Sequence, residues 1–299
     1  MPRDREPGES EARDIDRLRE QEARRGVDPR EVFSRDLNLP RGLRRERIGN
    51  CRLRASEVRT LATVGAFRVV REDDLQRLAG SGELLSKDVE PLRQAGLVST
   101  SAYVVGRERC TLVTLTDQGR AVLESSRGDR NQPRPQAFYV GSTKRELAHD
   151  SRLLPAYLDA AERLARDGCR IQRVTLDREL KREYQSFLQD PNRRRRGATG
   201  QPRRDREAIA RWAEEHGLPV IDDSVKFPDF RIEYDRPDGE AGHQDIEVVT
   251  PNYRGSHASA KVSAGFTCYR YGSARVGGAG SSGRGGRGRE SRLAEEMLH

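Results

Sequence analysis

The chain has few cysteines, few aromatic side chains and no long apolar run. Its four cysteines are widely separated and form no CxxC pair, which argues against a disulfide framework and against a zinc site. No apolar stretch approaches the length of a membrane span, and charged residues rather than a signal peptide follow Met1. We therefore expect a cytoplasmic protein that has no membrane partner.

Charged residues, by contrast, are abundant. They make up 35% of the 299 residues, against 34% for hydrophobic residues, and the net charge is +8. A basic balance that comes mostly from arginine predicts a polyanionic partner, although a GC-rich genome that prefers arginine on a soluble surface would give the same composition. The length of 299 residues predicts one to three domains, and the low apolar content predicts a modest core in each.

Composition divides the chain into five parts. Residues 1–50 are dense in charge and almost free of aromatic side chains, so we expect most of them to be disordered. A polar, proline-containing linker at 129–142 separates two regions of regular pattern, 51–128 and 143–273. The last part, 274–299, is a flexible tail rich in glycine and arginine.

The first region has the pattern of three helices followed by a strand hairpin and a fourth helix. Apolar residues at helical spacing predict helices that end at Gly65, Leu78 and Ala95. Two strands around a charged turn follow, and then a last helix that the stretch beginning at Thr116 is expected to cap. This order is typical of a winged helix-turn-helix. The stretches Leu-Arg-Gln-Ala-Gly-Leu-Val at 92–98 and Leu-Thr-Asp-Gln-Gly-Arg at 115–120 resemble winged-helix proteins of the broad MarR-like class.

In a winged helix the third helix enters the major groove of duplex DNA, and the hairpin, or wing, reaches phosphates or the minor groove. Pro91 lies inside the predicted third helix, where it removes a backbone hydrogen bond and is expected to bend the helix. The same fold also serves protein contacts or homodimer formation, and that alternative stays open. The predicted DNA contacts are Ser86, Lys87 and Arg93 on the third helix and Arg107 and Arg109 on the wing.

The second region predicts a domain of mixed helices and strands. One long helix is expected at 143–167, begun by a capping box of Thr143 and Glu146. A strand, an insertion with two helices, two strands, a helix and a last strand follow, in the order of the restriction-endonuclease-like core with its mixed sheet. The expected fold class is therefore α+β or α/β: a winged helix followed by a nuclease-like mixed-sheet domain, with flexible tails.

Carboxylates occur on two strands that the pattern predicts to be neighbours. Pro228-Asp229 opens the first strand and Glu247 lies in the second, with Lys261 on the helix after them. This arrangement resembles the PD-(D/E)xK nucleases, in which carboxylates bind Mg²⁺ or Mn²⁺ and the cation activates water against a phosphodiester. The position of the motif lysine holds Val249, so Lys261 would have to replace that lysine.

Further residues could complete such a site. Asp245 lies two positions before Glu247, and so on the same face of the strand, as an additional metal ligand. Glu146 from the long helix would complete the shell, and His149 could act as an acid or base or only pack the helix. The candidate catalytic residues are Asp229, Glu247, Lys261 and Glu146, and the candidate metal ligands are Asp229, Glu247 and Asp245.

Each part also has an ordinary explanation. Pro-Asp is a common turn dipeptide, and an acidic strand residue or a helical lysine often only faces solvent. Against this, Glu247 lies in an otherwise apolar strand, where a carboxylate is costly unless it has a partner. The run Arg193, Arg194, Arg195 and Arg196 is either a solvated insertion or a loop that grips DNA phosphates, and we favour the second because the winged helix already implies DNA.

Short motifs spread over 54–272 resemble the replication-relaxation family of plasmids and integrative elements. They are Glu-Leu-Ala-His-Asp at 146–150, Asp-Arg-Glu-Leu-Lys-Arg at 177–182, Pro-Asp at 228–229, Glu-Val-Val-Thr at 247–250 and Ala-Lys at 260–261. The resemblance implies a winged helix joined to a nuclease-like half, acting in replication, relaxation or mobilisation of a bacterial mobile element. Double-stranded DNA, with relaxase or replication proteins, would be the partner. Two activities stay open: a metal-dependent DNA nickase, or a non-catalytic regulator or relaxosome accessory protein with a degenerate nuclease fold.

Overall fold

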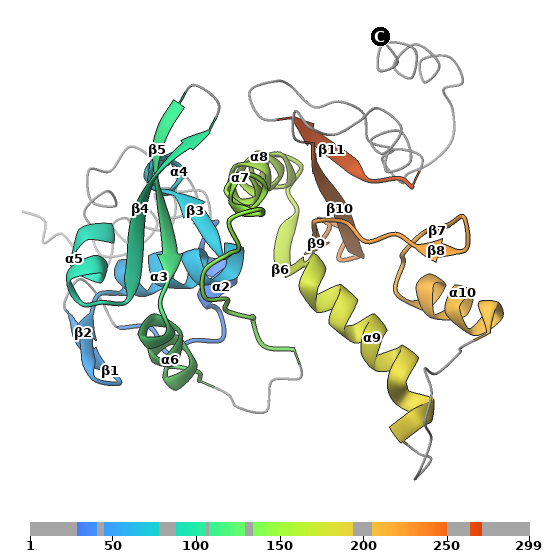
Figure 1. Cartoon of the computed structure of the whole chain (residues 1–299), viewed down its shortest axis with the longest axis horizontal. Helices are drawn as coiled ribbons and strands as arrows, with labels where there is room; N and C mark the ends of the chain where they lie inside the picture. The colour runs from blue at the N-terminus through green and yellow to red at the C-terminus, as the bar shows by residue number, and fades with distance from the viewer. Residues whose placement is uncertain are drawn as a thin grey trace, which may run out of the picture.

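The chain forms a mixed α+β structure, and the strands of its described residues make four sheets (Figure 1). The two larger sheets have three and four strands and lie in different parts of the chain. None of the helices in the described residues is long and apolar enough to cross a membrane. The computed structural model describes residues 29–40, 45–77, 88–105, 108–128, 134–193, 205–249 and 264–270.

The three-stranded sheet belongs to the first predicted region. Its elements are α3 (Ala55–Phe67), β3 (Val69–Arg71), α4 (Glu72–Arg77), α5 (Val89–Gln94), β4 (Val98–Val105), β5 (Glu108–Leu115) and α6 (Asp117–Ser125). The strand order is β3-β5-β4, and all neighbours are antiparallel. The helices and the hairpin expected here are therefore present, although the first part of the expected third helix, residues 82–87, lies outside the described part of the chain.

A close backbone approach fixes the start of α6. The hydroxyl oxygen of Thr116 accepts a hydrogen bond from the Gly119 amide at 3.0 Å and so caps the helix, as predicted. A Cβ on Gly119 would lie 2.1 Å from the carbonyl oxygen of Leu97. Only glycine fits at this position, and α6 can therefore pack directly against the backbone before β4.

Pro91 does not lie in a helix interior, contrary to the sequence-based expectation, because α5 begins only at Val89. It occupies the first turn, where backbone amides have no partner within the helix and proline is tolerated. The reason to expect a bend is thereby removed. Val89 and Leu92 are buried whereas Glu90 and Arg93 are exposed, so α5 turns one face to the core and one to solvent.

The four-stranded sheet belongs to the second predicted region. Its neighbourhood comprises α7 (Leu147–Asp150), α8 (Leu153–Arg166), β6 (Arg170–Leu176), α9 (Asp177–Arg193), α10 (Arg206–Glu215), β7 (Val220–Ile221), β8 (Ser224–Val225), β9 (Phe230–Asp235), β10 (Ala241–Val249) and β11 (Thr267–Arg270). The strand order is β11-β10-β9-β6. β10 and β11 are parallel and the other neighbours antiparallel, so the expected mixed sheet is confirmed. The helix expected between β10 and β11 falls on residues outside the described ranges.

One expectation for this region is wrong: residues 143–167 form two helices rather than one. α7 ends at Asp150 and α8 begins at Leu153. Pro155 explains the break, because it has no amide hydrogen for the carbonyl of Ser151 and its ring would clash with that carbonyl in a continuous helix.

Part of the region 1–50, which composition predicts to be mostly disordered, is ordered. In or next to it lie α2 (Glu31–Ser34), β1 (Glu46–Ile48) and β2 (Cys51–Leu53). Phe33 is completely buried, with its ring centroid 5.2 Å from that of Phe67 and 5.1 Å from that of Tyr157. A few apolar side chains are enough to anchor this segment, and average composition does not reveal them.

One hydrophobic core runs through both predicted regions. Phe67 at the end of α3 contacts Tyr157 of α8 and Phe230 of β9, with ring centroids 5.5 and 6.3 Å apart. The predicted linker joins this packing, since the Tyr139 amide donates to the carbonyl oxygen of Gly65 at 2.8 Å. Side-chain packing, and not the chain connection alone, therefore holds the two regions together.

Replacing Phe67 by alanine should lower the free energy of unfolding by about 3–5 kcal/mol, because it removes a fully buried ring that contacts both regions. Chemical denaturation followed by circular dichroism measures the change. Val140→Ala is the control, since Val140 is exposed and its truncation should cost under about 0.5 kcal/mol. Equal losses in the two variants would contradict the central place of Phe67 in the core.

Candidate functional site

Asp229 lies at the entry to β9, where three elements meet. Its carbonyl oxygen accepts a hydrogen bond from the Asp177 amide and its amide donates to the Ile246 carbonyl, both at 2.9 Å. The carboxylate oxygen Oδ2 accepts from the Val248 amide at 2.7 Å and lies 3.0 Å from Nε2 of His149. Asp229 is thus fixed between α7 and the C-terminal part of β10.

His149 lies between two carboxylates. Its Nε2 faces Asp229, and its Nδ1 lies 3.3 Å from Oδ1 of Asp150. Burial disfavours the protonated ring, but the hydrogen bonds and charges of Asp150 and Asp229 outweigh burial and raise the pKa of His149 to about 10. At neutral pH the side chain is therefore an imidazolium that compensates the charge of Asp229.

Asp150 is completely buried and also meets Arg68, the residue that follows α3. Nη2 of Arg68 donates to Oδ1 of Asp150 at 3.0 Å, and the same guanidinium lies 3.8 Å from Glu146 and 3.9 Å from Asp177. The Ser142 hydroxyl donates to the other oxygen of Asp150 at 2.5 Å. Arg68 has a φ of 67°, a left-handed conformation that costs roughly 1–3 kcal/mol in residues other than glycine. The surrounding carboxylates offset that cost.

Glu146, expected to complete a metal shell, is surrounded by cations. Its carboxylate lies 3.8 Å from Arg68 and 3.7 Å from Arg178. The hydroxyl of Thr143 donates to the same carboxylate at 3.1 Å, and the predicted capping box is not formed, because α7 starts without a side-chain cap bond. The contacts that connect Glu146 to Asp229 pass through Arg68 and the Asp150–His149 pair.

Glu247 lies in β10 opposite Cys268 of β11. Only 2% of Glu247 is exposed, which confirms the prediction that this carboxylate lies within an apolar strand. Its role as a metal ligand stays a prediction. Val249, at the position of the motif lysine, is also buried.

Asp245, the other carboxylate expected on this strand, forms a bidentate ion pair with Arg231 of β9. Its Oδ1 accepts from Nε at 2.6 Å and its Oδ2 from Nη2 at 2.8 Å. Arg231 also donates to the carbonyl oxygens of His216 and Gly217 after α10, at 2.5 and 2.9 Å. Both oxygens of Asp245 therefore help to hold α10 on the sheet, and its role as a metal ligand stays a prediction.

Two arginines that hold these carboxylates, Arg68 and Arg231, are not predicted from the sequence. For Arg231 a signal exists, because a tight turn at Asp238 and Gly239 sets the hairpin register in which residue 231 faces Asp245. For Arg68 there is no such signal, since its closest carboxylate is 82 positions away in the sequence.

The predicted DNA contacts are placed only in part. Arg93 is exposed on α5, and its guanidinium donates to Glu90 at 2.7 and 2.8 Å. Arg109 is exposed on β5, opposite Val104, of which 58% is exposed. Arg193 is the last residue of α9. Outside the described residues lie Ser86, Lys87, Arg107, Arg194, Arg195, Arg196 and Lys261.

The carboxylates near Asp229 are ligands of the type that a hard cation prefers. The number of ligands that the described residues bring together is smaller than such a cation needs. In the ranges that the structure describes, no three histidine, cysteine, aspartate or glutamate side chains are arranged to hold a metal ion. The chain matches no protein-family model, no curated protein and no solved structure. Its chemistry must therefore be judged from the cluster itself, in which a cation at Asp229 would compete with the His149 imidazolium.

The His149 ring should titrate near pH 10 in metal-free protein, and Asp150→Asn should lower that pKa, because one of its two anionic partners becomes neutral. Because the folded-state pKa is raised, the contribution of His149 to stability is complete below its ordinary value of 6.5 and is lost as the pH rises through about 10. Histidine-ring NMR titration measures the value.

His243 is the internal control in that titration, since burial, followed by the charge of Arg231, lowers its pKa below the ordinary value. A His149 signal that titrates with His243 would contradict the ion pair with Asp150 and Asp229.

Proposed function

We propose that the chain is a duplex-DNA-binding protein in which residues 51–128 act as a winged helix. The observation that carries the proposal is the order helix, strand, helix, helix, hairpin, with sheet order β3-β5-β4. In such a fold the last helix before the hairpin enters the major groove and the hairpin contacts the backbone. The net charge of +8 favours the same partner.

The exposed surfaces of these elements support this assignment. The hairpin of β4 and β5 projects beyond the helices around it (Figure 1). Arg109 on this hairpin has an exposed side chain that can reach a phosphate. For Arg93 on α5 to bind a DNA phosphate, its guanidinium would have to give up its hydrogen bonds to the Glu90 carboxylate. Hydrogen bonds from Arg93, followed by Gln94, lower the pKa of Glu90 to about 2, so this competitor is anionic at neutral pH.

Arg109→Ala should weaken binding to random-sequence duplex DNA and reduce the slope of log K against log salt by about one, because one phosphate contact is lost. Fluorescence anisotropy with a labelled duplex at several salt concentrations measures both quantities.

Arg166→Ala serves as the control for Arg109→Ala. Arg166 is also an exposed arginine, but it lies at the end of α8, outside the proposed winged helix. A loss of affinity of the same size in both variants would show a general charge effect and would remove the hairpin from the DNA contact.

A second candidate function is metal-dependent nicking of DNA, in the context of replication, relaxation or mobilisation of a mobile element. The observation that favours it is the hydrogen bond of the Asp229 carboxylate to the Val248 amide, which brings this carboxylate to the strand that carries Glu247. Asp229 and Glu247 would hold the cation, with Lys261 as the cationic group. A bound Mg²⁺ or Mn²⁺ supplies polarisation of the phosphodiester and an activated water.

The non-catalytic alternative is a regulator or relaxosome accessory protein. Three features favour it: Val249 replaces the motif lysine, His149 neutralises Asp229, and both oxygens of Asp245 accept from Arg231. In that case the second region binds DNA or partner proteins without cutting.

If the nickase proposal holds, supercoiled plasmid with Mg²⁺ or Mn²⁺ should become relaxed circles. Asp229→Asn and Glu247→Gln should reduce the rate at least about a hundredfold, the order expected when a group that stabilises the transition state is lost. Agarose-gel time courses measure the rate.

Glu215→Gln is the matched control, because Glu215 is an exposed carboxylate at the end of α10. It should nick at the unsubstituted rate. Absence of nicking by the unsubstituted protein, or equal nicking by all four proteins, would reject the catalytic assignment and leave the DNA-binding proposal standing.

A further inference from the structure

The hairpin of β1 and β2, called the basic ribbon from here on, carries two arginines that lie directly opposite each other. In its register Arg47 pairs with Arg52, and Ile48 pairs with Cys51. Successive residues of a strand face opposite sides, so the two arginines share one face of the ribbon. Both side chains are exposed. Like charges in such a pair are destabilising in the free protein, and an anion that binds both would remove that cost.

The other face of the basic ribbon is fixed to the rest of the protein. Ile48 and Leu53 are buried and belong to the main hydrophobic core. Glu57 is completely buried in the first turn of α3, where it accepts from Nη2 of Arg45 at 2.5 Å and from the Arg54 amide at 2.8 Å. These bonds tie both ends of the ribbon to α3. The backbone that carries the two exposed arginines is therefore in place before any ligand binds, which lowers the entropy cost of binding.

The guanidinium groups of the ribbon have donors to spare. Nε of Arg47 donates to the carbonyl oxygen of Gly49 at 3.2 Å, and neither Arg47 nor Arg52 forms an ion pair within the part of the chain that the structure describes. The neighbouring carboxylates are poor competitors, because Glu46 lies on the opposite face of β1 and Glu57 is buried and paired. An anionic partner would thus meet two cations that carry no internal counter-charge.

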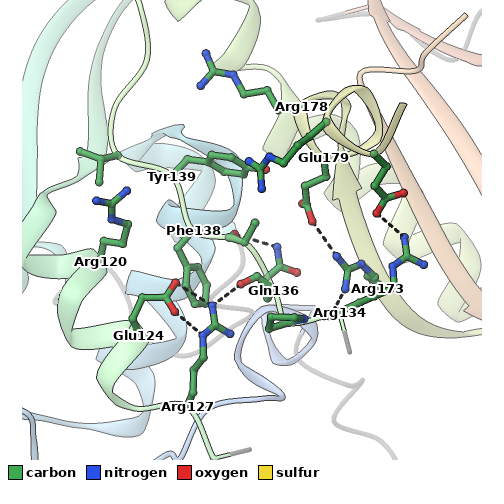
Figure 2. Close-up of a pocket in the computed structure, with 15 residues that line it drawn as sticks. Arg120, Glu124, Arg127, Arg134, Gln136, Phe138, Tyr139, Arg173, Arg178 and Glu179 are labelled. Carbon is green, nitrogen blue, oxygen red and sulfur yellow. Dashed lines mark hydrogen bonds and ion pairs between the residues drawn. The ribbon is translucent and has the colours of Figure 1, made fainter. Parts of the chain in front are cut away.

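The arginines of a second basic surface are compensated instead. Six arginines line a cleft between α6 and α9, but three glutamates lie among them (Figure 2). The contacts include those of Arg127 with Glu124, Arg173 with Glu179 and Arg134 with Glu183. A phosphate in that cleft would have to displace carboxylates, whereas a phosphate at the basic ribbon would not.

The basic ribbon lies next to the helix that we propose to enter the major groove. α3 follows β2, and the Ser56 hydroxyl near its start donates at 3.3 Å to the carboxylate of Asp88, the residue before α5. In Figure 1 the ribbon lies below α5, and the β4–β5 hairpin rises above it. A helix in the major groove has a sugar-phosphate backbone on either side, so elements that flank α5 can each contact a strand.

We propose that the basic ribbon is a second phosphate-binding element of the winged helix, in which Arg47 and Arg52 contact the backbone of duplex DNA on the side of α5 opposite the wing. The inference rests on the proposed DNA-binding function and adds a contact to it. Each guanidinium keeps its charge at all physiological pH values and can donate two parallel hydrogen bonds to a phosphate. Such contacts carry no sequence preference, and they fix the position of α5 on the duplex.

Fluorescence anisotropy of the full chain with a labelled random-sequence duplex, at several salt concentrations, tests the proposal. Arg47→Ala and Arg52→Ala should each weaken binding about tenfold, the fold-change of one lost charge-assisted hydrogen bond. The double alanine variant should reduce the slope of log K against log salt by about two, because two phosphate contacts are lost. Replacing both residues by lysine should keep the slope, since both charges remain.

Two controls accompany these variants. The double alanine variant should unfold at the temperature of the unsubstituted protein or above it in circular dichroism, because both side chains are exposed and their repulsion is removed. Arg166→Ala, at the exposed end of α8, should bind the duplex like the unsubstituted protein. An equal loss in Arg166→Ala would show a general charge effect and overturn the proposal.

The other outcomes separate the ribbon from the winged helix itself. Unchanged affinity and slope in the double alanine variant, with binding still weakened by Arg109→Ala, would overturn the ribbon and leave the winged helix standing. No binding of the duplex by the unsubstituted protein would overturn both. Polyglutamate that binds more tightly than the duplex, and is lost in the double alanine variant, would assign the ribbon to an acidic protein partner instead.

Discussion

The guanidinium of Arg68 is the interaction on which the arrangement of the two regions depends. It lies buried directly after α3 and meets Asp150, Glu146 and Asp177, which belong to α7, to its start and to α9. Such a group cannot simply be left without its partners, because an uncompensated buried charge costs roughly 3–5 kcal/mol. The ion pairs of Arg68 therefore hold α7 and α9 beside the end of α3, where Phe67 packs against Phe230 of the sheet.

A series of contacts connects Arg68 to the four-stranded sheet of the second region. Asp150 accepts from Arg68 and also faces His149, and His149 faces Asp229, whose carboxylate accepts from the Val248 amide. Alternating positive and negative groups thus connect the first region to β10. A ligand at Asp229 would therefore contact a network of ion pairs that extends to Arg68 in the first region.

Local signals in the sequence predicted local structure well. The cap at Thr116, the hairpin of β4 and β5 and the mixed sheet are short-range patterns that the structure bears out. The break before α8 was readable from Pro155 but was overridden by the apolar spacing. The burial of Phe33 and the pairing of Arg68 depend on partners far along the chain, and composition or periodicity cannot supply them. The winged-helix and nuclease-like assignments stay interpretations of element order.

The length of the turn between β9 and β10 determines how the residues of these two strands pair. Its pairing places Arg231 opposite Asp245, and Gly239 supplies the positive φ of 86° that the turn needs. Side chains alternate between the two faces of a strand, so the insertion or deletion of one residue in this turn would send the carboxylates of β10 to the opposite face. Length variation should thus be tolerated in exposed loops elsewhere but not here, even though the turn itself is exposed and its Gly239 has open space around it.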